Sequence, residues 1–288
     1  MRARAPASTA NLGPGFDALA IALNLYVQVE VEPAAEFVIR SEGEGAGTCD
    51  DTTHLAARVV KRVLGHDRVA IMVRSQIPVA RGLGSSAALA VAAAAAAGAE
   101  DPFAVGAEVD GHAENAAASA MGGLVTAGTT DGHPYAVHLA LSDSLAFVVI
   151  VPDHSLATAD ARRVLPGTVS REDATFNLGR MGLLLAGLTD PSVLRTEATA
   201  DRLHQDARTA LFPEAPQLLD GLVQAGALAS CWSGAGPSLL GITTKLDAAH
   251  VRMGSERALH ATGLPGRVLL LQADLAGVVS GDEATWPP

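Results

Sequence analysis

Apolar and polar residues alternate between positions 25 and 32, with valine at 27, 29 and 31 and polar side chains at 28, 30 and 32. Because neighbouring side chains of a strand point to opposite faces, this alternation predicts a half-buried strand. Shorter apolar runs predict further strands at residues 36–40, 69–74, 147–151, 227–232, 239–243 and 267–272. Strands are therefore expected along most of the chain.

Residues 85–97 are mostly alanine, the strongest helix former, and Gly98 follows as a stop signal. Other helices are predicted at residues 53–64, from 102 toward 110, and at 158–164, 177–188, 216–224 and 246–261. Helices and strands mixed without strict alternation predict an α+β protein. The pattern changes near Val151, which predicts two domains, at residues 1–150 and 151–288.

Composition excludes several classes of protein. With 288 residues, of which 49% are hydrophobic and 18% charged, the chain can bury a large core and is not intrinsically disordered. The net charge of −11 disfavours nucleic acid or an anionic membrane as the main partner. No apolar run is long enough to span a bilayer, and the start is too polar for a secretory signal. Two cysteines, Cys49 and Cys231, favour a reducing cytoplasm.

The segment from Pro78 to Ala88 carries the most specific chemistry. Its residues Gly82-Leu83-Gly84-Ser85-Ser86 stand between a predicted strand and the alanine-rich helix. Glycine allows a tight turn and a close ligand, and a helix start offers free N–H groups that bind phosphate. The alternative is a glycine-rich turn with a serine helix cap. The chain has no Walker P-loop sequence.

Two other segments combine small polar residues with glycines. Residues 6–17 read Pro-Ala-Ser-Thr-Ala-Asn-Leu-Gly-Pro-Gly-Phe-Asp, in which Asn11 and Asp17 could contact a polar ligand or form turns. Residues 233–238 read Ser-Gly-Ala-Gly-Pro-Ser and could be a ligand loop or a simple hairpin connection.

In this order, the three segments resemble the GHMP small-molecule kinase superfamily, and within it the homoserine kinase family of threonine biosynthesis. The resemblance covers nearly the whole chain, including residues 152–162 and 201–208. It implies a two-domain α+β fold, with an N-terminal domain like domain 2 of ribosomal protein S5 and a ferredoxin-like C-terminal domain. The site is then expected between the domains.

The resemblance also assigns residues to roles. For ATP it implicates Pro78, Arg81, Gly82, Leu83, Gly84, Ser85 and Ser86. For the amino acid it implicates Asn11, Asp17, His112 and Gly234. For catalysis it implicates Asn115, Arg162 and Arg208. Arginine suits a carboxylate or phosphoryl group because it binds bidentately. Alternatively, Arg162 closes a helix and Arg208 pairs with Asp206 or Glu214 on the surface.

One segment departs from the family pattern. The family sequence Gly-His-Pro-Asp-Asn reads Gly111-His112-Ala113-Glu114-Asn115 here, and the preceding helix is shortened. The family often has a Mg²⁺-binding glutamate eleven residues before the asparagine, where this chain has Ala104. Ser86 with Glu108 or Asp110 could hold the ion instead, since Mg²⁺ needs few protein carboxylates. The two acids could equally form an exposed helix face.

The resemblance therefore implies ATP-dependent phosphorylation of the side-chain hydroxyl of L-homoserine, with Mg²⁺, in the cytoplasm. The expected partners are small molecules, ATP and a hydroxy amino acid, with a possible homodimer and neither nucleic acid nor membrane. The altered segment leaves open another acceptor, such as threonine, or a nucleotide-binding homologue that has lost catalysis. The chain lacks a Gly-x-Ser-x-Gly elbow and a His-Glu-x-x-His zinc motif, which disfavours hydrolase chemistry.

Overall fold

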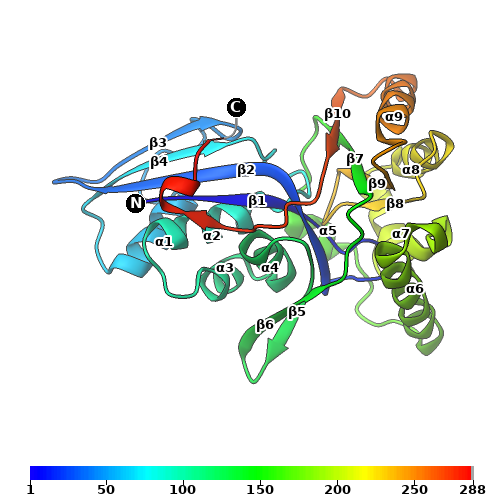
Figure 1. Cartoon of the computed structure of the whole chain (residues 1–288), viewed down its shortest axis with the longest axis horizontal. Helices are drawn as coiled ribbons and strands as arrows, with labels where there is room; N and C mark the ends of the chain where they lie inside the picture. The colour runs from blue at the N-terminus through cyan, green and yellow to red at the C-terminus, as the bar shows by residue number, and fades with distance from the viewer. Residues whose placement is uncertain (287–288) are drawn as a thin grey trace.

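A computed structural model describes residues 1–286 and contains two β-sheets side by side (Figure 1). The first sheet has the order β11-β1-β2-β4-β3, and a β5–β6 hairpin joins it through β2. Its strands are β1 (Arg2–Ala10), β2 (Leu19–Pro33), β3 (Val38–Gly43), β4 (Val69–Ser75), β5 (Leu124–Thr130), β6 (His133–Leu139) and β11 (Val279–Ser280). The pairing is antiparallel except between β3 and β4.

The second sheet is antiparallel and has the order β10-β7-β9-β8. Its strands are β7 (Leu145–Pro152), β8 (Ala229–Trp232), β9 (Leu239–Thr244) and β10 (Gly266–Leu271). Helices α8 (Ala215–Gln224) and α9 (Ala248–Thr262) pack on it. The remaining helices of this half are α5 (Thr158–Arg163), α6 (Arg171–Thr189) and α7 (Gln205–Arg208), with short 3₁₀ turns at Pro191–Val193, Thr196–Thr199 and Thr209–Leu211.

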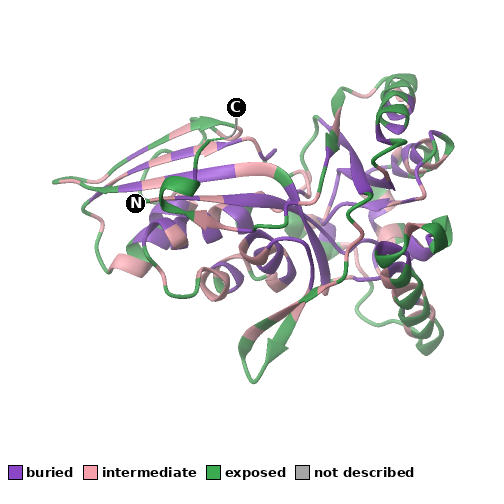
Figure 2. Ribbon diagram, in the orientation of Figure 1, coloured by how far each residue is buried: buried purple, intermediate pink, exposed green. Residues whose placement is uncertain are grey.

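Four helices cover one face of the first sheet: α1 (Leu55–Leu64), α2 (Ser85–Ala96), α3 (Pro102–Asp110) and α4 (Ala113–Met121). The alanine-rich α2 lies at the centre, against β1, β2 and all three other helices. Alanine side chains are small, so neighbouring backbones can approach α2 closely from several sides. Figure 2 shows buried ribbon in the central strands and in the helices packed on them, and Ala90, Ala92, Ala93 and Ala94 are fully buried.

Most predicted elements are confirmed, and so is the α+β class. The alanine-rich helix and the helix after Asp101 have the expected bounds within one residue. The structure extends the predicted strand 25–32 back to Leu19 and begins the predicted helix 177–188 at Arg171. It also adds β1, α4 and the β5–β6 hairpin, which the predicted elements do not include.

The C-terminal segment returns to the first sheet. β11 pairs with β1, and a 3₁₀ turn (Gly281–Glu283) follows it. Gln28 was expected on an exposed face, but it is buried and donates to the carbonyl of Ala284. The predicted domain boundary at residue 150 falls inside β7, which belongs to the second sheet; the division itself stays a prediction. Among the described residues, no helix is long and apolar enough to cross a membrane.

Candidate functional site

A cavity of about 620 Å³ lies at the glycine loop between β4 and α2. Gly82 and Gly84 have φ angles of +72° and +63°, in the left-handed region. A Cβ at Gly82 would lie 2.1 Å from the carbonyl oxygen of Ser233, and one at Gly84 would lie 2.0 Å from Ser8 Oγ. Both positions therefore require glycine for conformation and for space.

Gly84 is the N-cap residue of α2, and no side chain caps this helix. The alternative of a serine cap is therefore wrong, since Ser85 and Ser86 are the first two helical residues. The first N–H groups of α2 have no side-chain partner, and the positive end of the helix dipole lies at the cavity. This arrangement suits a phosphate group.

Backbone contacts bring the three sequence segments together. The amide of Ser8 donates to the carbonyl of Leu83 at 3.2 Å, and that of Gly234 donates to the carbonyl of Ala10 at 3.0 Å. Ser233 Oγ donates to the carbonyl of Gly82 at 2.7 Å. Three segments that are far apart in the chain thus form one wall of the cavity.

Arg81 joins the glycine loop to the second sheet. Its guanidinium donates to the carbonyl of Val79 at 3.0 Å and to that of Pro152, at the end of β7, at 2.9 Å. These bonds occupy much of its donor capacity, so Arg81 holds the loop against the second sheet.

The other end of the cavity carries an ion pair between residues 145 positions apart. Arg162 in α5 donates to both carboxylate oxygens of Asp17, at 2.6 and 3.1 Å, and to Nε2 of His112 at 3.2 Å. Asn11 Oδ1 accepts the amide of Asp17 at 3.0 Å and so fixes the turn. Asn11 and Asp17 have positive φ angles of 71° and 55°. Asn and Asp adopt this region more readily than other non-glycine residues, so the loop can turn tightly at both positions.

His112 lies between the acidic residues and Arg162. The carboxylate of Asp110 accepts a hydrogen bond from the ring and raises the pKa of His112, while partial burial opposes the shift. Because Arg162 can only donate, Nε2 of His112 carries the lone pair and Nδ1 carries the hydrogen, so the imidazole is neutral in this arrangement.

Asn115 connects this end to the glycine loop. Ser8 Oγ donates to Asn115 Oδ1 at 2.8 Å, and Asn115 Nδ2 donates to Glu114 Oε1 at 3.0 Å. The Asn115 side chain therefore has a defined orientation. Glu114 is buried, and burial raises the pKa of its carboxyl group. In the sequence, Glu114 is marked only by its departure from the family pattern.

The structure gathers most of the predicted site residues around this single cavity. Those that line it are Asn11, Asp17, Pro78, Arg81, Gly82, Leu83, Gly84, Ser85, Ser86, Asp110, His112, Asn115, Arg162 and Gly234. Arg208 and Glu108 do not line it. Arg208 is 2% exposed and donates to the carbonyl of Gly234 at 2.9 Å, rather than pairing with Asp206 or Glu214. Glu108 instead forms an ion pair with Arg62 of α1.

Sequence spacing does not identify two residues, Phe16 and His204, that contact predicted site residues. Phe16 follows the two glycines of the first segment, and its ring stacks on that of His204, with centroids 4.9 Å apart. The Cζ atoms of Arg162 and Arg208 each lie 5.6 Å from the centroid of the Phe16 ring. Phe16 thus lies in contact with the two arginines assigned to catalysis. The only sequence signal was its place between Gly15 and Asp17.

Comparison with known proteins agrees with this geometry. Residues 51–123 match the model of the GHMP kinases N terminal domain, and residues 178–252 match that of the GHMP kinases C terminal domain. A homoserine kinase from Thermus thermophilus is 42% identical, over 92% of this chain and 94% of that protein. One from Desulfitobacterium hafniense is 34% identical, over 96% and 98%.

This chain belongs to the homoserine kinase family of the GHMP kinases. The crystal structure of homoserine kinase from Cytophaga hutchinsonii matches the fold with a TM-score of 0.85 at 26% identity, covering 97% of this chain and 96% of that one. The predicted family and two-domain GHMP fold are therefore confirmed, and the chain is an enzyme of the kinase class. GHMP kinases use ATP as a substrate.

Proposed function

We propose that this kinase transfers the γ-phosphoryl group of ATP to the side-chain hydroxyl of L-homoserine and releases O-phospho-L-homoserine. The observation that supports this most is that the uncapped start of α2 and the ion pair between Asp17 and Arg162 lie in the same cavity. The start of α2 suits a triphosphate, and Asp17 with Arg162 offers a charge for each end of a zwitterion.

The acceptor would bind by exchanging ion pairs. The Asp17–Arg162 pair is about 40% exposed on each side chain, so its disruption costs little. The ammonium group of homoserine would take Asp17 as its partner, and the carboxylate would take Arg162. His112 would then stand beside the bound carboxylate, since it contacts Arg162 directly. Arg208 contacts the Phe16 ring, as Arg162 does, and would add positive charge.

Phosphoryl transfer depends mainly on alignment and charge stabilisation. The N–H groups at Ser85 and Ser86 would hold the phosphates of ATP. Asn115 would orient the hydroxyl, because its amide is fixed by Ser8 and Glu114. An amide does not accept a proton at neutral pH, so the hydroxyl proton would pass to the transferred phosphoryl group.

The cavity also has donors suited to Mg²⁺. No group of three His, Cys, Asp or Glu residues that could hold a metal exists within residues 1–286. However, the hydroxyl of Ser86 and the carboxylates of Asp110 and Glu114 line the cavity, and Mg²⁺ binds to one or two carboxylates together with phosphates and water. We propose these three residues as its protein ligands. The ion would neutralise negative charge on the phosphates.

A coupled assay of ADP release tests the function. Purified enzyme is given MgATP with homoserine, threonine, serine or no acceptor. We expect rapid turnover with homoserine and much slower turnover with threonine and serine. A preference for threonine would overturn the assignment of the acceptor. Retained nucleotide binding without ADP release from any acceptor would show that catalysis has been lost.

The product indicates which biosynthetic pathway the reaction would serve. We propose that O-phosphohomoserine made here serves threonine biosynthesis in the cytoplasm. Both cysteines are free, as is usual in a reducing compartment. The homodimer expected from the family stays a prediction, which size-exclusion chromatography with light scattering can test.

A further inference from the structure

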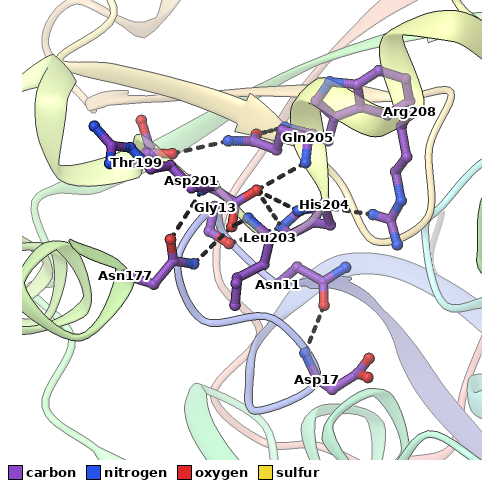
Figure 3. A network of polar contacts seen from close by, with 12 residues as sticks. Asn11, Gly13, Asp17, Asn177, Thr199, Asp201, Leu203, His204, Gln205 and Arg208 are labelled. Atoms are coloured by element: carbon purple, nitrogen blue, oxygen red, sulfur yellow. Dashed lines mark hydrogen bonds and ion pairs between the residues drawn. The ribbon is translucent and has the colours of Figure 1, made fainter. Parts of the chain in front are cut away.

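A buried polar cluster lies behind the acceptor end of the cavity, and the proposed reaction uses only one of its members, Arg208. It contains Asn177, Asp201, His204 and Arg208, each with 7% exposure or less (Figure 3). Buried polar groups are costly unless they are paired, so a cluster of this size needs a reason. The contacts of His204 supply one.

The neighbours of His204 specify a single tautomer. Nε2 lies 2.8 Å from the carbonyl oxygen of Gly13, which can only accept, so Nε2 carries the hydrogen. Nδ1 lies 2.9 Å from Nη1 of Arg208, which can only donate, so Nδ1 carries the lone pair. His204 must therefore be neutral for both bonds to form. Burial lowers the pKa of His204 to about 4, in agreement with this assignment.

His204 thereby connects two parts of the site that are 195 positions apart in the chain. Through Nε2 it holds Gly13, in the loop that leads to Asp17, and through Nδ1 it holds Arg208 (Figure 3). The Phe16 ring stacks on the imidazole from the same loop. A shift of the imidazole would move both the acceptor loop and the arginine.

The position of His204 is itself fixed. The carboxylate of Asp201 accepts the backbone amides of Leu203, His204 and Gln205 at 2.8–3.0 Å. It also accepts Asn177 Nδ2 at 2.7 Å. Four donors around one buried carboxylate hold the turn that begins α7. Asp201 thus sets the backbone from which His204 and Arg208 project.

Arg208 is left with unused donors. Its Nη1 contacts His204 and the carbonyl of Gly234, whereas its Nε is buried and has no partner within residues 1–286. A buried guanidinium with an unpaired donor favours an incoming anion. The orientation of that donor depends on the bond to His204.

We infer that His204 is a positioning residue, which as a neutral imidazole aims Arg208 at the anionic group of the substrates and ties it to the loop of Gly13 and Asp17. This inference rests on the proposed function. Kinetics of two variants test it. Gln can keep the N–H that His204 gives to Gly13, whereas Asn can keep the acceptor that His204 offers to Arg208.

For His204→Gln, we expect kcat/KM for homoserine to fall about 10- to 100-fold, because a hydrogen bond to a charged group is lost. The KM for ATP should stay within about twofold, since α2 is not contacted. His204→Asn should keep most of the activity at saturating homoserine and show mainly a raised KM. An equal rise in both KM values for the Gln variant would overturn the inference.

A double-mutant cycle separates positioning from a merely structural role. If His204 acts through Arg208, adding His204→Gln to Arg208→Ala should cause almost no further loss. If the two losses multiply, the inference is wrong. Failure of the wild-type enzyme to use homoserine would refute the proposed function instead, which the same assay shows before any variant is made.

A measurement on the wild-type protein covers the case in which a variant does not fold. Nitrogen-15 spectra of the imidazoles distinguish the tautomers, and His204 should stay neutral at pH 5 with its hydrogen on Nε2. A hydrogen on Nδ1, or a charged imidazole, would contradict the assignment.

Discussion

At the scale of single residues, the charged side chains of the site pair with one another, and in the proposed function the substrate would replace one of these pairs. Asp17 and Arg162 pair on a partly exposed surface, whereas Asp201, His204 and Arg208 are buried. The first pair contributes little to stability, because solvent screens it, so it can be exchanged for substrate. The second cluster is shielded from solvent and is expected to affect folding as well as catalysis.

Replacing Asp17 by Asn tests the exchange. The free energy of unfolding should change by less than about 1 kcal/mol, since the pair is exposed. The KM for homoserine should rise about 10-fold or more, because the ammonium group loses its charged partner. Asp160→Asn is a matched control, since Asp160 forms a similar exposed pair with Arg163 on α5. Equal effects of the two substitutions on KM would exclude a role for Asp17 in binding.

His204 also predicts how stability depends on pH. Its pKa is about 4 when folded against an ordinary value of 6.5, because burial disfavours the charged form and outweighs the attraction of Asp201; Arg208 also disfavours it. The unfolded chain therefore binds a proton that the folded chain does not. Stability should be complete above pH 6.5 and fall as the pH drops toward 4.

Urea unfolding of wild type and His204→Asn between pH 7 and pH 4.5 measures this effect. The variant should be less stable at pH 7 and should lose less stability across the interval. Parallel curves for the two proteins would show that His204 does not contribute to the acid sensitivity.

At the scale of elements, the glycine loop depends on close contacts between backbone atoms at positions where a side chain would not fit. Gly82 approaches the carbonyl of Ser233 so closely that its Cα hydrogen is the largest group that fits. The same approach joins the loop to the segment that carries Gly234. The start of α2 can then present its amides without a capping side chain.

Gly82→Ala should destabilise the protein by about 3 kcal/mol or more and abolish nucleotide binding, because the new Cβ meets backbone. Gly65→Ala is the matched control. Gly65 has a φ of +75°, similar to the +72° of Gly82, but a Cβ there meets nothing within 4 Å. The free energy of unfolding of that variant should fall only by the cost of placing a Cβ in the left-handed region, about 1–2 kcal/mol. Thermal unfolding and calorimetric titration with ATP distinguish the two.

At the scale of the whole molecule, the first sheet is completed by the end of the chain. Arg4 donates to the carbonyl of Thr285 at 2.9 Å, and Tyr26 donates to Asp274 at 2.8 Å. Burial, together with the hydrogen bond to Asp274, raises the pKa of Tyr26 to about 12. The two halves of the enzyme are thus linked through this returning segment as well as through the site.

The free energy of unfolding of a chain that stops before Val279 should be lower by about 2 kcal/mol or more. In that chain, buried Gln28 loses its acceptor at Ala284, and β1 loses its neighbouring strand β11. A chain that stops after Thr285 keeps these contacts and serves as the control. The urea midpoint should fall only for the shorter chain. Equal midpoints would mean that the returning strand does not stabilise the sheet.

Sequence alone determined the elements with strong local signals, because periodicity and capping act over a few residues. The strand around Val29, the helix of alanines after Gly84 and the helix after Asp101 required no tertiary information. The glycine and serine motifs identified the family and most of the cavity, because their order along the chain is specific. The β5–β6 hairpin also has a local signal, because Asp131 and Gly132 join its strands with φ angles of 53° and 80°, while β5 alone pairs with β2.

Tertiary structure decided which charges meet. Glu108 and Asp110 are near neighbours in sequence, yet one pairs with Arg62 and the other lines the cavity. Nothing local separates them, since the direction of each side chain depends on how α3 packs. The contact of His204 with Gly13 likewise depends on a buried turn packing against a loop from the other end of the chain, whereas Arg208 is only four residues from His204. Long-range packing, which local patterns do not encode, fixed those partners.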